Sequence, residues 1–111
     1  MFDRISAYRI MWIFVFFDLP TETKTQRKEY SEFRKFLLTE GFSMMQYSVY
    51  TRHCISREFM EAKLRRVQIK LPRYGKVTIM QVTDKQFSMI NNYYQGDYEK
   101  PPNAPQQIGM F

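Results

Sequence analysis

An uninterrupted apolar run constrains the fold of this chain more than any other feature. The eight residues 10–17, IMWIFVFF, lead directly into Asp18 and then a Leu-Pro step. β-Branched and aromatic side chains occupy both alternating sets of positions, a pattern typical of a central strand that is covered on both faces. The run has fewer than half of the roughly 20 residues that a membrane-spanning helix needs. We therefore predict a buried strand and no membrane span.

Length and composition indicate one small domain. We assign residues 1–95 of the 111-residue chain to this domain, with residues 1–9 as an N-terminal extension and residues 96–111 as a tail that carries a docking strand. The single cysteine, Cys54, excludes an internal disulfide and a cysteine-based zinc cluster. The polar N-terminal segment has no signal-peptide pattern, which favours a cytoplasmic location.

The remaining periodicities alternate between helix and strand. Residues 24–39 and about 56–71 have a helical period, and the first of these helices should have Thr21 or Thr23 as its N-cap and Gly41 as its C-terminal cap. Residues 42–52, 76–83 and 87–94 are predicted to be extended. This order predicts an α+β, ferredoxin-like βαββαβ fold with two helices on one face of an antiparallel sheet, plus a C-terminal strand.

Two apolar surfaces are left without a partner in such a fold. The sheet face opposite the helices would be bare, and its content of Phe, Met and Tyr predicts a homodimer formed through the sheet faces. The tail ends on Ile108, Met110 and Phe111, which we expect to dock on a sheet edge of the same chain or of a partner. A frayed terminus is the alternative for the tail.

Asp18 is the main candidate for chemistry. It lies where the first strand leaves the sheet, and it is either a turn residue of the Leu-Pro bend or a ligand for a hard metal ion such as Mg²⁺. A single aspartate is a poor magnesium site, whereas two copies that face each other across a two-fold axis form an adequate one. His53 and Cys54 are adjacent on an extended segment, which disfavours a catalytic pair.

Basic residues suggest a polyanionic partner. The net charge is +6, and aromatic residues make up 17% of the chain, a combination that suggests a polyanion, most often nucleic acid, with simple solubility as the alternative. Most candidate phosphate contacts lie on the two helices, and two lie on the extended segment between them. The candidates are Arg27, Lys28, Arg34, Lys35, Ser48, Arg52, Lys63, Arg65 and Arg66.

Several motifs together resemble the Cas-two (Cas2) family, small CRISPR-associated proteins of spacer acquisition. The first strand ends in DLP at residues 18–20, and the first helix carries Tyr, Phe-Arg-Lys and Leu at residues 30, 33–35 and 37. The segment GFSMMQYSVYTR at residues 41–52 and VTDKQF at residues 82–87 complete the pattern.

This resemblance implies a ferredoxin-like homodimer that holds one Mg²⁺ between the two copies of Asp18, with Asp18 as the catalytic residue. It further implies a metal-dependent endonuclease acting on RNA or double-stranded DNA. It also implies a DNA-binding dimer that bridges a CRISPR-associated integrase during spacer acquisition, and the basic helices and the small number of candidate catalytic residues favour this structural role as the main one. The alternative is a nucleic-acid-binding module outside CRISPR systems, with the same fold and no catalysis. An RNA-reading module is disfavoured because no Lys/Arg-Gly-Phe strand motif is present.

Overall fold

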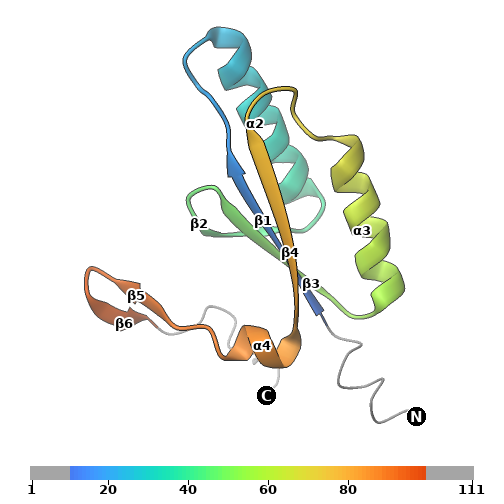
Figure 1. Cartoon of the computed structure of the whole chain (residues 1–111), viewed down its shortest axis with the longest axis vertical. Helices are drawn as coiled ribbons and strands as arrows, with labels where there is room; N and C mark the ends of the chain where they lie inside the picture. The colour runs from blue at the N-terminus through green and yellow to red at the C-terminus, as the bar shows by residue number, and fades with distance from the viewer. Residues whose placement is uncertain (1–10, 100–111) are drawn as a thin grey trace.

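The computed structural model describes residues 11–99 of the chain (Figure 1). This part has an α+β architecture, and the predicted ferredoxin-like βαββαβ arrangement is confirmed. In chain order its elements are β1 (Met11–Asp18), α2 (Lys24–Thr39), β2 (Ser43–Gln46), β3 (Val49–Cys54), α3 (Arg57–Ile69), β4 (Lys76–Thr83), α4 (Asp84–Ser88), β5 (Asn92–Tyr94) and β6 (Asp97–Glu99).

The apolar run forms the centre of an antiparallel sheet. The strand order is β2-β3-β1-β4, so β1 is hydrogen-bonded on both sides. Val15, for example, lies opposite Tyr50 of β3 and Ile79 of β4. This central place explains why the run is apolar at both alternating sets of positions.

One face of the sheet packs against both long helices. Ile13, Val15 and Phe17 alternate along β1 and point into a core that α2 and α3 cover from the same side (Figure 1). The helices contribute buried side chains at helical spacing, namely Phe33, Leu37, Met60 and Val67.

Local capping signals set the helix boundaries. Thr23 caps α2 in a reciprocal arrangement with Gln26, and Ser56 caps α3. Gly41 follows α2 with a φ of 88°, a left-handed conformation that favours glycine. Of the two predicted N-caps, Thr21 and Thr23, Thr23 is the one that caps α2, and the predicted terminating glycine is confirmed.

The sheet face opposite the helices is partly covered by the same chain, so the prediction of a bare face is wrong at one end of the sheet. Trp12 and Phe14 point to this face, yet they are only 9% and 3% exposed. Phe87 of α4 stacks on Trp12, with ring centroids 3.6 Å apart, and lies 5.8 Å from the ring of Phe14. A helix of the same chain therefore covers part of the face that we assigned to a partner.

The prediction of a strand over residues 87–94 is wrong for its first half. Thr83 and Gln86 form a capping box that begins α4, and only Asn92–Tyr94 is extended. This strand, β5, pairs with β6 in a separate two-stranded hairpin that projects away from the main sheet (Figure 1). The proposed division of the chain after residue 95 falls in the turn of this hairpin.

No helix in the described part of the chain is long and apolar enough to cross a membrane. The predicted N-terminal extension and the tail residues Ile108, Met110 and Phe111 lie outside residues 11–99.

Candidate functional site

Asp18 is the last residue of β1 and its side chain is exposed. Alternation along the strand places it on the same face as Phe16 and Phe14, opposite the two long helices. It borders an open hollow of about 250 Å³. The hollow is lined by Phe16, Phe17, Asp18, Ser48, Val49, Lys76 and Thr78.

A glycine on the neighbouring turn fixes the position of Asp18. Gly75 has a φ of 85°, and a Cβ at this position would lie 2.5 Å from the Asp18 carbonyl oxygen and 2.9 Å from Leu19 Cα. Backbone at this distance has no room for a side chain. The turn before β4 therefore packs directly on the strand end that carries the carboxylate.

The donor chemistry of Asp18 fits a hard cation. Carboxylate oxygens suit Mg²⁺, which keeps several water ligands and takes one or two protein carboxylates. Within residues 11–99 no three His, Cys, Asp or Glu side chains gather in a metal-binding group. The described part of one chain thus offers one carboxylate at this point, which fits half of a shared site.

Ser48 lies beside this carboxylate but not on a strand. It has a φ of 65° in the turn between β2 and β3, so our prediction that residues 42–52 are extended is wrong at this position. Its carbonyl oxygen accepts a hydrogen bond from the Phe17 amide at 3.1 Å. Its hydroxyl is 3.4 Å from that of Tyr30, so Ser48 links the turn to both β1 and α2.

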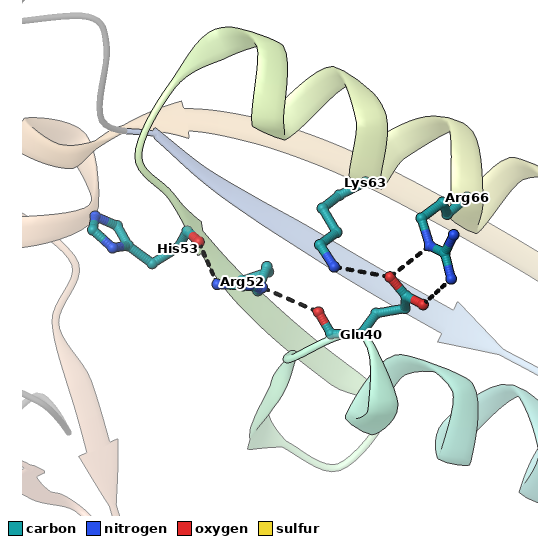
Figure 2. A network of polar contacts seen from close by, with 5 residues as sticks. All are labelled: Glu40, Arg52, His53, Lys63 and Arg66. Atoms are coloured by element: carbon teal, nitrogen blue, oxygen red, sulfur yellow. Dashed lines mark hydrogen bonds and ion pairs between the residues drawn. The ribbon is translucent and has the colours of Figure 1, made fainter.

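Two of the predicted phosphate contacts are bound to a buried carboxylate. Glu40, 6% exposed, follows α2 and accepts hydrogen bonds from Lys63 Nζ at 2.9 Å and from Arg66 Nε at 2.8 Å and Nη2 at 2.6 Å (Figure 2). These two cations lower the pKa of Glu40 from 4.5 to about 2, against the opposing effect of burial. The network joins α2 to α3.

Arg52 also has a structural role, but it donates to backbone carbonyl oxygens and not to a carboxylate. Its Nε donates to the Glu40 carbonyl oxygen at 3.1 Å, and its Nη1 donates to the carbonyl oxygen of His53 at 2.8 Å (Figure 2). Its guanidinium also lies 4.9 Å from the centroid of the Phe59 ring. Arg52 therefore holds the C-terminal end of α2 against β3.

The other basic candidates lie on the surface of the helices. Their positions are partly or fully open to solvent: Arg27, Lys28, Arg34, Lys35 and Arg65. Arg27 Nη1 also donates to the carbonyl oxygens of Thr21 and Glu22, both at 3.1 Å. The structure thus separates the predicted set into surface cations and cations that hold Glu40.

His53 and Cys54 do not form a catalytic pair. Cys54 is fully buried and burial raises the pKa of its thiol, whereas the His53 ring lies on the other face of β3. His53 Nε2 is 3.8 Å from Asp84 Oδ1, and burial lowers the pKa of this imidazole. The Trp12 indole donates to the same Asp84 oxygen at 2.8 Å.

Sequence reasoning missed two features of this face. Asp84 resembles a turn residue in the sequence, but it is the first residue of α4 and binds Trp12, 72 positions away. Lys76 was not among the predicted site residues, although it lies opposite Asp18 in the sheet. The capping box of Thr83 and Gln86 is a sequence pattern from which α4 can be predicted. The position of Lys76 opposite Asp18 follows only from the register of β4 on β1.

The family model and the known proteins that are similar to this chain all carry the same family description. The family model described as CRISPR associated protein Cas2 matches residues 11–90. A Flavobacterium psychrophilum protein is 48% identical over 110 residues, which cover 99% of this chain and 96% of the relative. A Parvibaculum lavamentivorans protein is 44% identical over 101 residues, which cover 91% and 100% of the two chains.

A third relative, from Paracidovorax avenae, is 41% identical over 107 residues, or 96% of this chain and 99% of its own. All three relatives bear the name CRISPR-associated endoribonuclease Cas2. The residues matched by the family model include the four-stranded sheet, its helices and Asp18. The chain therefore belongs to the family of CRISPR-associated protein Cas2.

Proposed function

We propose that this protein is a metal-dependent endoribonuclease of a CRISPR system and that Asp18 is its catalytic residue. The observation that carries the proposal is the position of Asp18, an exposed carboxylate at the end of β1 that borders a hollow. The names of the relatives supply the reaction class. Family membership favours this role over a nucleic-acid-binding module outside CRISPR systems.

The proposed cofactor is Mg²⁺, held by Asp18 of two chains. Mg²⁺ supplies positive charge that polarises a phosphodiester and activates a water molecule. Asp18 of each chain would hold the ion beside the hollow, whose lining includes the apolar side chains of Phe16 and Val49.

A homodimer through the sheet faces would bring the two aspartates together. Apolar side chains on the face of Asp18 support this arrangement: Phe16 and Val49 are half-buried, and Met80 is 42% exposed. Such a cluster beside a polar rim is typical of a protein interface. Because α4 covers Trp12, the proposed contact lies toward the Asp18 end of the sheet.

A second proposed function is a DNA platform in spacer acquisition, with this dimer bridging copies of the integrase. The surface cations of α2 support it, since Arg27, Lys28, Arg34 and Lys35 present positive charge along one helix. Contacts of this kind bind the phosphate backbone of a duplex without reading its sequence.

Asp18→Asn tests the nuclease proposal. We would compare wild type and variant on single-stranded RNA and duplex DNA, with Mg²⁺ and with a chelator. Asp97→Asn, which changes an exposed aspartate of β6, is the matched control. The proposal predicts Mg²⁺-dependent cleavage of RNA that only Asp18→Asn abolishes.

Two results would contradict this proposal. Equal RNA cleavage by wild type and Asp18→Asn would show that the carboxylate takes no part in the reaction. Absence of cleavage in wild type, with tight binding of duplex DNA, would leave the DNA platform as the function.

A further inference from the structure

We propose that Lys76 binds the scissile phosphate of the RNA beside Asp18. This inference rests on the proposed nuclease function and adds a substrate-binding residue to its site. Lys76 and Asp18 are directly opposed in the antiparallel pairing of β4 with β1. Directly opposed residues project from the same face of a sheet, with Cβ atoms about 4.5–5.5 Å apart.

The backbone around this pair leaves little freedom. Gly75 packs on the Asp18 carbonyl oxygen at a distance that no side chain would allow. This contact fixes the start of β4 against the end of β1, and Lys76 is the next residue. The relative placement of the two charged side chains is therefore set by tight backbone packing and not by the side chains themselves.

Both charged groups remain available to a ligand. The four ion pairs found within residues 11–99 involve neither Asp18 nor Lys76. Lys76 is exposed and lines the same hollow as Asp18. By contrast, the ammonium group of Lys63 forms an ion pair with Glu40 at 2.9 Å and so has a structural role.

The charges of the phosphodiester and of the Asp18 carboxylate explain the role of a lysine at position 76. A phosphodiester is an anion, so a carboxylate at the end of β1 repels it. A cation bound to Asp18 would reduce that repulsion, and the ammonium group of Lys76 adds a compact positive charge with three donors. Thr78, which also lines this hollow, carries a hydroxyl group that is a further donor for phosphate oxygens.

Binding without cleavage gives the first test. In the Asp18→Asn background we would measure the affinity of a labelled single-stranded RNA by fluorescence anisotropy, in a chelator and at several salt concentrations. Adding Lys76→Gln should weaken binding severalfold and reduce the slope of log K against log salt by about 0.7, the value for one phosphate of a single strand. Lys85→Gln, which removes an exposed lysine of α4, should change neither quantity.

Cleavage kinetics with Asp18 intact give the second test. Lys76→Gln should lower kcat/KM for RNA by about tenfold or more, because a positioned positive charge is removed from the reacting phosphate. Lys76→Arg keeps the charge and should retain most of the affinity. An exposed residue such as Lys76 is replaced without loss of the fold, which circular dichroism would verify.

The outcomes separate this inference from the proposed function. If Asp18→Asn abolishes cleavage while Lys76→Gln binds and cleaves like wild type, the role of Lys76 is disproved and the nuclease function stands. If Asp18→Asn cleaves like wild type, the nuclease function at Asp18 fails and the role of Lys76 fails with it. If Lys85→Gln weakens RNA binding as much as Lys76→Gln, the effect is one of net charge and the assignment is overturned.

Discussion

Arg66 binds the Glu40 carboxylate at two points, with Nε 2.8 Å from Oε1 and Nη2 2.6 Å from Oε2. This two-point geometry is the strongest form of an arginine–carboxylate contact. Glu40 follows the last turn of α2 and Arg66 lies in the last turn of α3, so the pair joins the ends of the two helices that cover the core.

Removing the charge of Glu40 should destabilise the protein. Glu40→Gln leaves Lys63 and Arg66 without their anion, and we expect a loss of about 2 kcal/mol in the free energy of unfolding at pH 7. The loss is moderated because the Arg66 side chain is 60% exposed and therefore screened by solvent. Denaturant unfolding would measure it.

The control is a second glutamate–arginine pair on the surface. Glu29 binds Arg73 at 2.8 Å, with the arginine side chain 70% exposed, and Glu29→Gln should cost clearly less than Glu40→Gln because solvent screens the pair. Equal effects of the two substitutions would contradict a special role for Glu40.

Acid should remove the stabilising contribution of the Glu40–Arg66 pair. The folded-state pKa of Glu40 is lowered to about 2, so its contribution is complete above its ordinary value of 4.5 and is lost as the pH falls from 4.5 toward 2. Wild type should therefore lose its advantage over Glu40→Gln in that window. A constant difference in unfolding free energy between pH 7 and about pH 3 would argue against the ion pair.

Gly75 and Gly96 give a matched test of backbone packing. Their φ values are 85° and 86°, but a Cβ at Gly75 meets Asp18 and Leu19, whereas one at Gly96 meets nothing within 4 Å. Gly96→Ala should cost about 1 kcal/mol for the left-handed conformation alone, and Gly75→Ala should cost clearly more.

Gly75→Ala should also reduce the proposed RNA cleavage, because it displaces the strand end that carries Asp18. Thermal melting and cleavage assays on both alanine variants would measure the two effects. Similar losses in both would mean that the close approach at Gly75 has no cost of its own.

The fluorescence of Trp12 should report the docking of α4. Trp12 is the single tryptophan of the chain and it stacks on Phe87. Phe87→Ala should shift its emission to the red and lower stability by about 1–3 kcal/mol, because the indole loses its stacking partner. Tyr93→Ala, at a side chain that is 65% exposed on β5, should leave the emission unchanged.

His53, which lies beside Trp12 and Asp84, predicts that the stability of the protein depends on pH near neutrality. Burial lowers the pKa of His53 below 6.5, with a partly opposing effect of Asp84, so the unfolded chain binds a proton more readily than the folded one. Stability should therefore fall as the pH drops through 6.5, and His53→Gln should flatten that part of the profile. Unfolding curves at about pH 7.5 and about pH 5.5 would decide this.

Duplex DNA should bind through the surface cations of α2. Replacing Arg34 and Lys35 with Gln should reduce the slope of log K against log salt by about 1.8, since each contact with B-form DNA contributes about 0.9. Lys70→Gln with Lys85→Gln removes the same charge elsewhere. Equal changes in the slope for the two double variants would show an effect of net charge and contradict a specific contact at α2.

Local patterns in the sequence were sufficient for most of the fold. The apolar run predicts a strand with both faces covered, and helical spacing of apolar residues predicts α2 and α3. Thr23 and Gly41 act through contacts within a few residues of the chain, so their roles are visible without a structure. The segment after β4 differs from the prediction in its first half, because the capping box of Thr83 and Gln86 begins a helix there.

Pairs of residues that are distant in the sequence became apparent only from the tertiary packing. Lys63 and Arg66 belong to a set of basic residues on the predicted helices, and this set predicts phosphate contacts. Only the packing of α3 beside the end of α2 pairs the two residues with Glu40. In the same way, the apolar run is enough to predict that Asp18 ends a buried strand. It cannot predict that Lys76 faces Asp18, because the register of β4 on β1 depends on side-chain packing along the whole sheet.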